Sequence, residues 1–172
     1  MHLIPLWQRL LLMLLRVNVR YTSRVTAQLS SGPIVLTSNH LSLLDGVIIA
    51  LASPRPLAFA VNSGHAKDNP FTRTGLQILA AMGLGRVIAV DSARPLAMRQ
   101  LLQVLRAGQS VMIFPEGRIS PNGQPLPPMP GVDWLARRAM VPVLKLRIRG
   151  AERSRLFAHA GDTIWPRVWL RF

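Results

Sequence analysis

The chain of 172 residues contains no cysteine and is poor in aromatic residues. The absence of cysteine excludes disulfide bonds and thiolate metal sites. The four histidines, at positions 2, 40, 65 and 159, do not have the spacing of metal ligands, so we expect no metal centre. Aromatic residues make up only 6% of the chain, which disfavours single-strand nucleic-acid binding through base stacking.

Acidic residues are also scarce, since seven of them accompany 21 lysines and arginines, and the formal net charge is +14. Lysine occurs only at positions 67 and 145, so almost every cation is an arginine. A compositional preference for arginine explains this ratio but not the net charge. A chain this basic attracts polyanions, which include anionic lipid headgroups, nucleic acids and acidic proteins.

Long apolar runs are missing as well, although 49% of the residues are hydrophobic and the mean hydropathy is +0.27. No run reaches the roughly 18–20 apolar residues of a membrane-spanning helix. Residues 3–16 form a shorter apolar stretch that predicts a helix lying in a membrane interface, with Arg9 and Arg16 on nearly one face and Trp7 at headgroup level. The alternatives are a helix packed on its own domain and the apolar region of a signal peptide. Under the first interpretation, deletion of residues 1–16 releases the protein from membranes.

Strand-like and helix-like segments alternate along the rest of the chain. This alternation predicts an α/β domain with a largely parallel central sheet flanked by helices. We expect two parts, a membrane-associating helix in residues 1–20 and one domain in residues 21–172. The last predicted strand stops at the chain end, which indicates a fragment of a longer protein. The predicted strands cover residues 34–38, 57–61, 86–90, 110–114, 141–148 and 168–172, and the predicted helices cover 43–52, 71–82, 95–106 and 132–139.

A histidine and an aspartate follow the first predicted strand, at His40 and Asp45. A histidine at a strand end and an aspartate in the next helical turn can fold back onto each other. The carboxylate would then fix the tautomer of the ring, whose other nitrogen is left free to act as a general base. The alternative is purely structural, because residues 42–45 also match a helix capping box in which Asp45 binds an otherwise unpaired N–H.

A second group of polar residues, Glu116, Gly117 and Arg118, follows the apolar strand predicted over residues 110–114. Ligands collect at the carboxyl ends of strands in open α/β sheets. Gly117 permits backbone conformations that other residues resist, and Arg118 offers a planar fork that suits a phosphate. The alternative is a turn with an exposed ion pair. No hydrolase nucleophile elbow, Walker sequence or dinucleotide fingerprint is present.

Three ordered motifs, Asn39-His40-x4-Asp45, Phe114-Pro115-Glu116-Gly117 and Val141-Pro142-Val143, resemble the glycerolipid acyltransferase family, which includes the 1-acylglycerol-3-phosphate acyltransferases. The resemblance runs from about Val17 to the C-terminus. Most members read E-G-T-R-S where this chain reads E-G-R-I-S, so the arginine is displaced by one residue. This feature and residues 55–61 and 90–98 are similar to one branch, the acyltransferase domain of bifunctional 2-acylglycerophosphoethanolamine acyltransferase/acyl-[acyl carrier protein] synthetases.

The resemblance implies transfer of a fatty acyl group from an acyl carrier protein or coenzyme A thioester to a lysophospholipid hydroxyl, without a metal or organic cofactor. It implies that His40 is the base, that Asp45 orients it, and that Glu116, Gly117 and Arg118 bind the glycerophosphate part of the acceptor. Asn39 is expected to help stabilise the oxyanion.

The expected acceptor is 2-acylglycerophosphoethanolamine, with 1-acylglycerol-3-phosphate as the alternative. The expected location is the cytoplasmic face of a bacterial inner membrane, on anionic lipids and without nucleic acid. The remaining alternative is a non-enzymatic, basic membrane-binding module.

Overall fold

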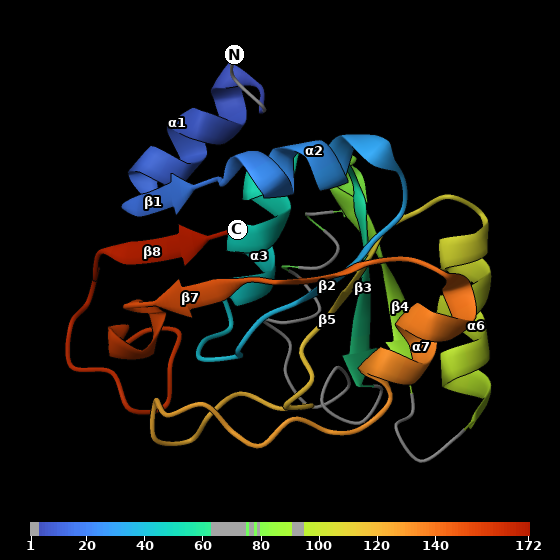
Figure 1. The fold of residues 1–172 in the computed structure, drawn as a ribbon. Helices are drawn as coiled ribbons and strands as arrows, with labels where there is room; N and C mark the ends of the chain where they lie inside the picture. The colour runs from blue at the N-terminus through green and yellow to red at the C-terminus, as the bar shows by residue number, and fades with distance from the viewer. Residues whose placement is uncertain (1–3, 63–74, 76–77, 79, 91–94) are drawn as a thin grey trace.

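The computed structural model describes residues 4–62, 75, 78, 80–90 and 95–172, which form two sheets and their covering helices (Figure 1). The larger sheet has five parallel strands in the order β4-β3-β5-β2-β6. The expected α/β class with a parallel central sheet flanked by helices is therefore confirmed. These strands are β2 (Val35–Thr37), β3 (Leu57–Asn62), β4 (Gly85–Val90), β5 (Val111–Ile113) and β6 (Val143–Lys145).

Successive side chains of the central strands point to opposite faces of the sheet, and both faces are covered. On one face Val35 and Val111 pack with Leu105 and Leu135, which come from α6 (Pro95–Arg106) and α7 (Val132–Ala139). On the other face Leu36, Phe59 and Met112 pack with residues of α3 (Asp45–Ala52). Burial on both faces explains why the sequence of these strands is a continuous apolar run without polar alternation.

The parallel register brings the ends of β2 and β5 to one edge of the sheet. Thr37 lies directly beside Ile113 in this register. The residues that follow each strand, from Ser38 in one case and from Phe114 in the other, therefore emerge next to each other. This edge carries both polar motifs of the sequence.

The smaller sheet has three strands in the order β1-β8-β7, and it was not predicted. Strand β1 (Val17–Arg20) runs parallel to β8 (Val168–Arg171), and β7 (Arg147–Arg149) runs antiparallel to β8. The single strand predicted over residues 141–148 is thus wrong in its extent. The chain leaves the larger sheet after β6, the Leu146 N–H bonds the Thr37 carbonyl at 2.7 Å, and β7 then joins the smaller sheet.

The N-terminal segment contains a short helix, α1 (Leu6–Leu14), followed directly by β1. Strand β1 lies within the N-terminal part expected over residues 1–20 and pairs with β8 of the domain. Gln8 and Leu12 are buried, and α1 packs against α3. Among the described residues, no helix is both long and apolar enough to cross a membrane.

The remaining helices and strands compare with the predictions as follows. The predicted strands at 34–38, 57–61, 86–90, 110–114 and 168–172 and the helices at 43–52, 95–106 and 132–139 all appear, with ends shifted by at most two residues. The helix predicted over 71–82 lies largely outside the described residues. Helix α2 (Ser23–Ser31) and the short 3-10 helix η1 (Ala151–Arg153) were not predicted.

Candidate active site

His40 and Asp45 contact each other at the edge where β2 and β5 end. The His40 Nδ1 atom lies 3.1 Å from Asp45 Oδ2. The Asp45 side chain is fully buried, whereas 19% of the His40 side chain is exposed. The pair therefore has a shielded carboxylate at one end and an imidazole within reach of a ligand at the other.

The carboxylate of Asp45 collects hydrogen bonds from the turn that precedes α3. The backbone N–H groups of Leu41 and Ser42 both donate to Oδ2, and the Ser42 hydroxyl donates to Oδ1 at 2.8 Å. The bond from the Ser42 N–H is 2.8 Å long and lies in the turn before α3, whose N-cap residue is Leu44 and has no side-chain cap. The expected capping box is therefore not formed, and the Asp45 carboxylate instead joins the turn before α3 to the ring of His40.

The contact with Asp45 determines which nitrogen of His40 carries the proton. An ionised carboxylate only accepts hydrogen bonds, so Nδ1 must be the donor in the neutral ring. The Nε2 atom then keeps a free lone pair and can accept a proton from a bound hydroxyl. This is the arrangement that a general base requires.

The motif that follows β5 holds the imidazole from the other side. The ring of Phe114 stacks on the ring of His40, with centroids 4.0 Å apart and planes inclined by 17°. The Ser120 N–H donates to the His40 carbonyl at 2.9 Å. Both contacts limit the freedom of His40, which reduces the reorganisation needed during proton transfer.

Glu116 lies in the same site and is almost completely buried. Burial raises the pKa of its carboxyl group above the ordinary value, while backbone N–H groups of Leu126 and His40 and the nearby His40 ring act in the opposite direction. Its Oε2 atom has no hydrogen-bond partner among the described residues. A buried acceptor without a partner is costly unless a ligand satisfies it, which agrees with the prediction that Glu116 binds substrate.

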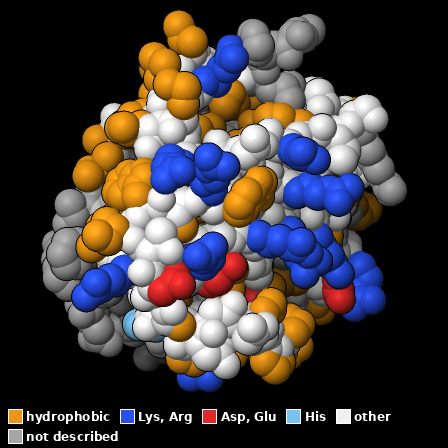
Figure 2. Space-filling model, turned by 90° about the vertical axis from the view of Figure 1, so that its left-hand side faces the viewer, with side chains coloured by type: hydrophobic (Ala, Val, Ile, Leu, Met, Phe, Trp, Pro, Cys, Tyr) orange, Lys and Arg blue, Asp and Glu red, His pale blue; other side chains and the backbone are white. Residues whose placement is uncertain are grey.

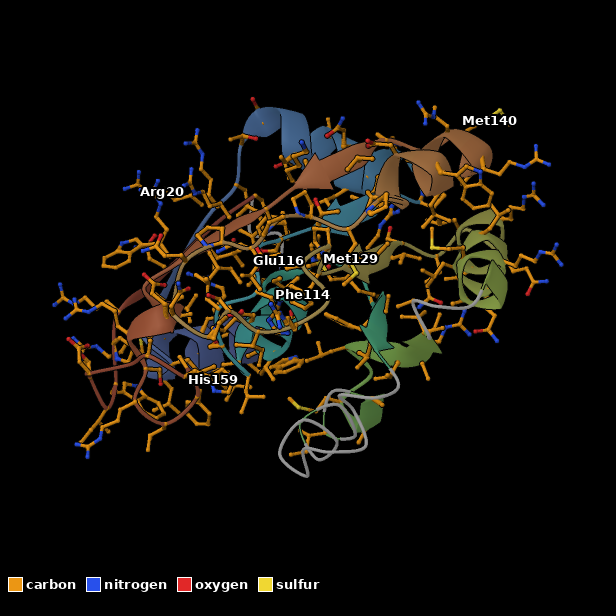
Figure 3. The ribbon with its side chains drawn as sticks, turned by 90° about the horizontal axis from the view of Figure 1, so that it is seen from below. Arg20, Phe114, Glu116, Met129, Met140 and His159 are labelled. Carbon is orange, nitrogen blue, oxygen red and sulfur yellow. The ribbon has the colours of Figure 1, made fainter. Side chains whose placement is uncertain are left out.

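Gly117 has a left-handed backbone conformation, with φ at +69°, and its Cα faces the side chain of Met129. A Cβ atom at this position would lie 2.8 Å from Met129 Cε, but that atom ends a flexible, exposed side chain that can move, so the left-handed backbone is what favours glycine. Met129 is held here because its N–H bonds the Pro115 carbonyl at 2.7 Å. Figure 3 shows Phe114, Glu116 and Met129 together near the middle of the molecule.

Arg118 and Asn39 occupy contrasting environments. The Arg118 side chain is exposed beside Gly117, where an anionic group of a ligand can reach it. The Asn39 side chain instead bonds the backbone of Ile148 twice, as donor to its carbonyl and as acceptor from its N–H, each at 2.9 Å. The geometry therefore assigns Asn39 a positioning role between β2 and β7, which differs from the expected contact with an oxyanion.

No cluster of three or more potential metal ligands occurs within the described part of the chain. The chemistry available at this edge of the sheet is thus that of a histidine base, a buried carboxyl group and an exposed guanidinium group. The model of the family described as Acyltransferase matches residues 16–149, which include every residue of this site. The chain belongs to the acyltransferase family.

Two relatives in this family carry more specific names. The chain is 29% identical over 174 residues to the 1-acyl-sn-glycerol-3-phosphate acyltransferase of Pseudomonas aeruginosa, and the match covers 96% of this chain and 60% of that protein. The fold of this chain is similar to the crystal structure of the 1-acyl-sn-glycerophosphate acyltransferase PlsC from Thermotoga maritima, with a TM-score of 0.62 and 21% identity. That match covers 95% of this chain and 63% of the other. The chain thus spans about three fifths of the length of both acyltransferases.

Within this acyltransferase-family site, sequence reasoning missed three contributions. The roles of Ser42 as a donor to Asp45, of Phe114 as the surface beneath His40, and of Ile148 as the anchor of Asn39 were not predicted. Ser42 was detectable, because the capping-box pattern of the sequence places its hydroxyl near the carboxylate. The contact with Ile148 joins residues 109 positions apart and crosses between two sheets, so no local pattern indicates it.

Proposed function

We propose that this chain transfers a fatty acyl group from a thioester donor to the free hydroxyl of a lysophospholipid, with His40 as the general base. The observation that carries this proposal is the 3.1 Å contact between His40 Nδ1 and Asp45 Oδ2 at the carboxyl edge of a parallel sheet, in a chain of the acyltransferase family. A hydroxyl is a weak nucleophile near neutral pH, so its activation needs a base of this kind.

In the proposed reaction His40 Nε2 removes the proton of the acceptor hydroxyl while the oxygen attacks the carbonyl carbon of the thioester. A new C–O bond forms, and the C–S bond breaks as the tetrahedral intermediate collapses. The departing thiolate then receives the proton from the imidazolium ring. Asp45 stabilises the positive charge of that imidazolium. The step balances without a metal or an organic cofactor.

The motif after β5 is proposed to hold the acceptor. The Glu116 carboxyl group is suited to a hydroxyl of the glycerol part, because its buried Oε2 atom has no partner among the described residues. The exposed Arg118 is suited to the phosphate, and it directly follows the left-handed turn at Gly117. The displaced position of the arginine relative to most family members bears on which headgroup is accepted.

Two acceptors are supported by different observations. The names of both relatives support 1-acylglycerol-3-phosphate. The sequence around Arg118 supports 2-acylglycerophosphoethanolamine, through its resemblance to the bifunctional branch. The donor is proposed to be an acyl carrier protein or coenzyme A thioester, and the protein is proposed to act peripherally at the cytoplasmic face of a bacterial inner membrane, where the exposed side of α1 contacts lipid.

A panel of acceptors and donors tests the proposal. Purified protein would be incubated with each of the two lysophospholipids and with acyl carrier protein or coenzyme A thioesters, with His40→Ala as the inactive reference. We expect release of free thiol and formation of a diacyl lipid with at least one pair of substrates. Absence of transfer with every pair, or equal transfer by His40→Ala, would contradict the proposal.

A further inference from the structure

We infer that the outer face of the three-stranded sheet binds the anionic headgroups of a phospholipid bilayer. Its central feature is a row of three arginines, Arg20, Arg171 and Arg147, which we name the arginine ladder. The inference deepens the proposed function, because it states how an enzyme acting on lysophospholipids sits on the membrane that contains them.

The ladder follows from strand register. Arg20 of β1 pairs directly with Arg171 of β8, and Arg171 pairs directly with Arg147 of β7. Side chains alternate along each strand, so Leu170 and Ile148 point into the core while the arginines point outward. Every strand of this sheet therefore contributes one cation to the same row.

Such a row is unfavourable for the isolated protein. Like charges directly opposite each other on neighbouring strands destabilise a sheet. In the described part of the chain, no carboxylate lies within ion-pairing distance of the three guanidinium groups; the exposed Asp162 pairs with Arg153 instead. A sheet face of this kind has the charge to bind an external polyanion.

The surroundings of the ladder favour a bilayer over an acidic protein or a nucleic acid. Trp169 pairs with Arg149 in the row next to the ladder and is half exposed, which suits an indole at the level of lipid headgroups. Helix α1 leads directly into β1 and exposes apolar side chains that neither a nucleic acid nor an acidic protein surface would match. These residues are Leu6, Leu10, Met13 and Leu14, and each has an exposed fraction between 51% and 70%.

The apolar and cationic parts belong to one face of the molecule. Figure 2 shows hydrophobic side chains along its upper left edge and a band of lysine and arginine side chains across its middle. Two hydrogen bonds join the end of α1 to the segment that leads into β8, from Trp165 Nε1 to the Leu14 carbonyl at 3.0 Å and from Arg16 Nη1 to the Trp165 carbonyl at 3.2 Å. Apolar insertion by α1 would therefore bring the sheet face to the headgroups.

The ladder is also connected to the active site. Ile148 lies between Arg147 and Arg149 on β7. Its backbone bonds the side chain of Asn39, which is the residue before His40. Headgroups bound at β7 are thus held against the strand that positions the base. This connection would place the catalytic loop at the membrane surface from which the acceptor comes.

Vesicle binding by matched variants tests the inference. The ladder variant is Arg20→Gln/Arg147→Gln/Arg171→Gln of the full chain, tested by co-sedimentation with phosphatidylglycerol and with phosphatidylcholine vesicles. We expect about a hundredfold weaker binding to the phosphatidylglycerol vesicles, because each of the three arginines near an anionic surface contributes about a factor of five. Binding to phosphatidylcholine vesicles, which depends on α1, should be unchanged.

The control variant is Arg106→Gln/Arg137→Gln/Arg138→Gln, which removes the same charge from exposed positions of α6 and α7. These helices lie on the opposite side of the molecule from β1, β7 and β8 (Figure 1). We expect the control to bind within about threefold of the wild type, because charges far from the surface are screened. Equal losses in both variants would overturn the inference in favour of an effect of net charge alone.

Two further outcomes also decide the question. Vesicle binding as strong as that of the wild type by the ladder variant would overturn the inference. If that variant instead lost binding to acyl carrier protein, the face would be assigned to an acidic protein. With a short-chain lysolipid dispersed as monomers, the ladder variant should transfer acyl groups at the wild-type rate. If the wild type transfers none, the proposed function fails while the vesicle result still stands.

Discussion

At the scale of single residues, Asp45 is the group on which the hydrogen bonds of the site converge. It binds the Leu41 and Ser42 N–H groups, the Ser42 hydroxyl and the His40 ring. A carboxylate held by several donors inside the protein keeps a fixed position without help from the substrate. The His40 tautomer is therefore set before the acceptor binds.

Glu116 gives a prediction about stability and pH. Burial raises the pKa of its carboxyl group, so the folded protein binds this proton more tightly than the unfolded chain does. The free energy of unfolding should consequently fall as the pH rises from the pKa of the unfolded state through that of the folded state. Glu116→Gln removes this decrease, and we expect it to be more stable than the wild type above both pKa values.

Urea unfolding of both proteins from about pH 4 to about pH 8 measures this difference. Other groups titrate in both proteins, so their contributions cancel in the comparison. A difference between Glu116→Gln and the wild type that grows on acidification would contradict the assignment of a raised pKa.

At the scale of secondary-structure elements, Asn39 connects the larger sheet to the smaller one. Its side chain makes two hydrogen bonds to Ile148 of β7 and accepts a longer one, of 3.3 Å, from the Ser38 hydroxyl. We expect Asn39→Ala to lower the free energy of unfolding by about 2 kcal/mol, because two hydrogen bonds of about 1 kcal/mol each are lost. The kcat of acyl transfer should also fall, because the loop that carries His40 loses its anchor.

The matched control is Asn18→Ala, since Asn18 is exposed on β1. We expect this variant to remain within about 0.5 kcal/mol of the wild type. Urea unfolding and initial rates of all three proteins make the comparison. Equal stability of the two variants would show that the bridge to Ile148 has no energetic role.

The elements also show how far sequence alone leads. The central strands β2, β3 and β5 were predictable, because burial on both faces gives each of them an apolar run, and this placed His40 and Glu116 after strand ends. Strand β1 has four residues and β7 has three, and neither was predicted as a separate strand. Their pairing with β8 depends on contacts between the two ends of the chain, which no local pattern records. The same long-range contacts fix Asn39.

At the scale of the whole molecule, α1 has a dual environment. Gln8 and Leu12 are buried against the domain, whereas Leu10 and Leu14 are 51% and 67% exposed. We expect Leu10→Gln/Leu14→Gln to bind both phosphatidylcholine and phosphatidylglycerol vesicles at least about tenfold more weakly, because two apolar side chains no longer leave water. Thermal unfolding should change little, since neither side chain is in the core.

The control for α1 is Trp134→Gln/Met140→Gln, which removes two exposed apolar side chains from the region of α7. We expect this variant to sediment with vesicles as the wild type does. If both double variants lose the same amount of binding, general surface hydrophobicity is responsible and α1 has no special part in it.

The measurement that tests the central claim most directly is the kcat of acyl transfer by His40→Ala, beside His159→Ala as the matched histidine control. His159 is exposed in the segment before β8, and Figure 3 shows it away from Phe114 and Glu116. General base catalysis contributes roughly 10²–10⁴ to a rate, so kcat should fall by that factor in His40→Ala and stay within about twofold in His159→Ala. Equal rates for His40→Ala and the wild type would contradict the account.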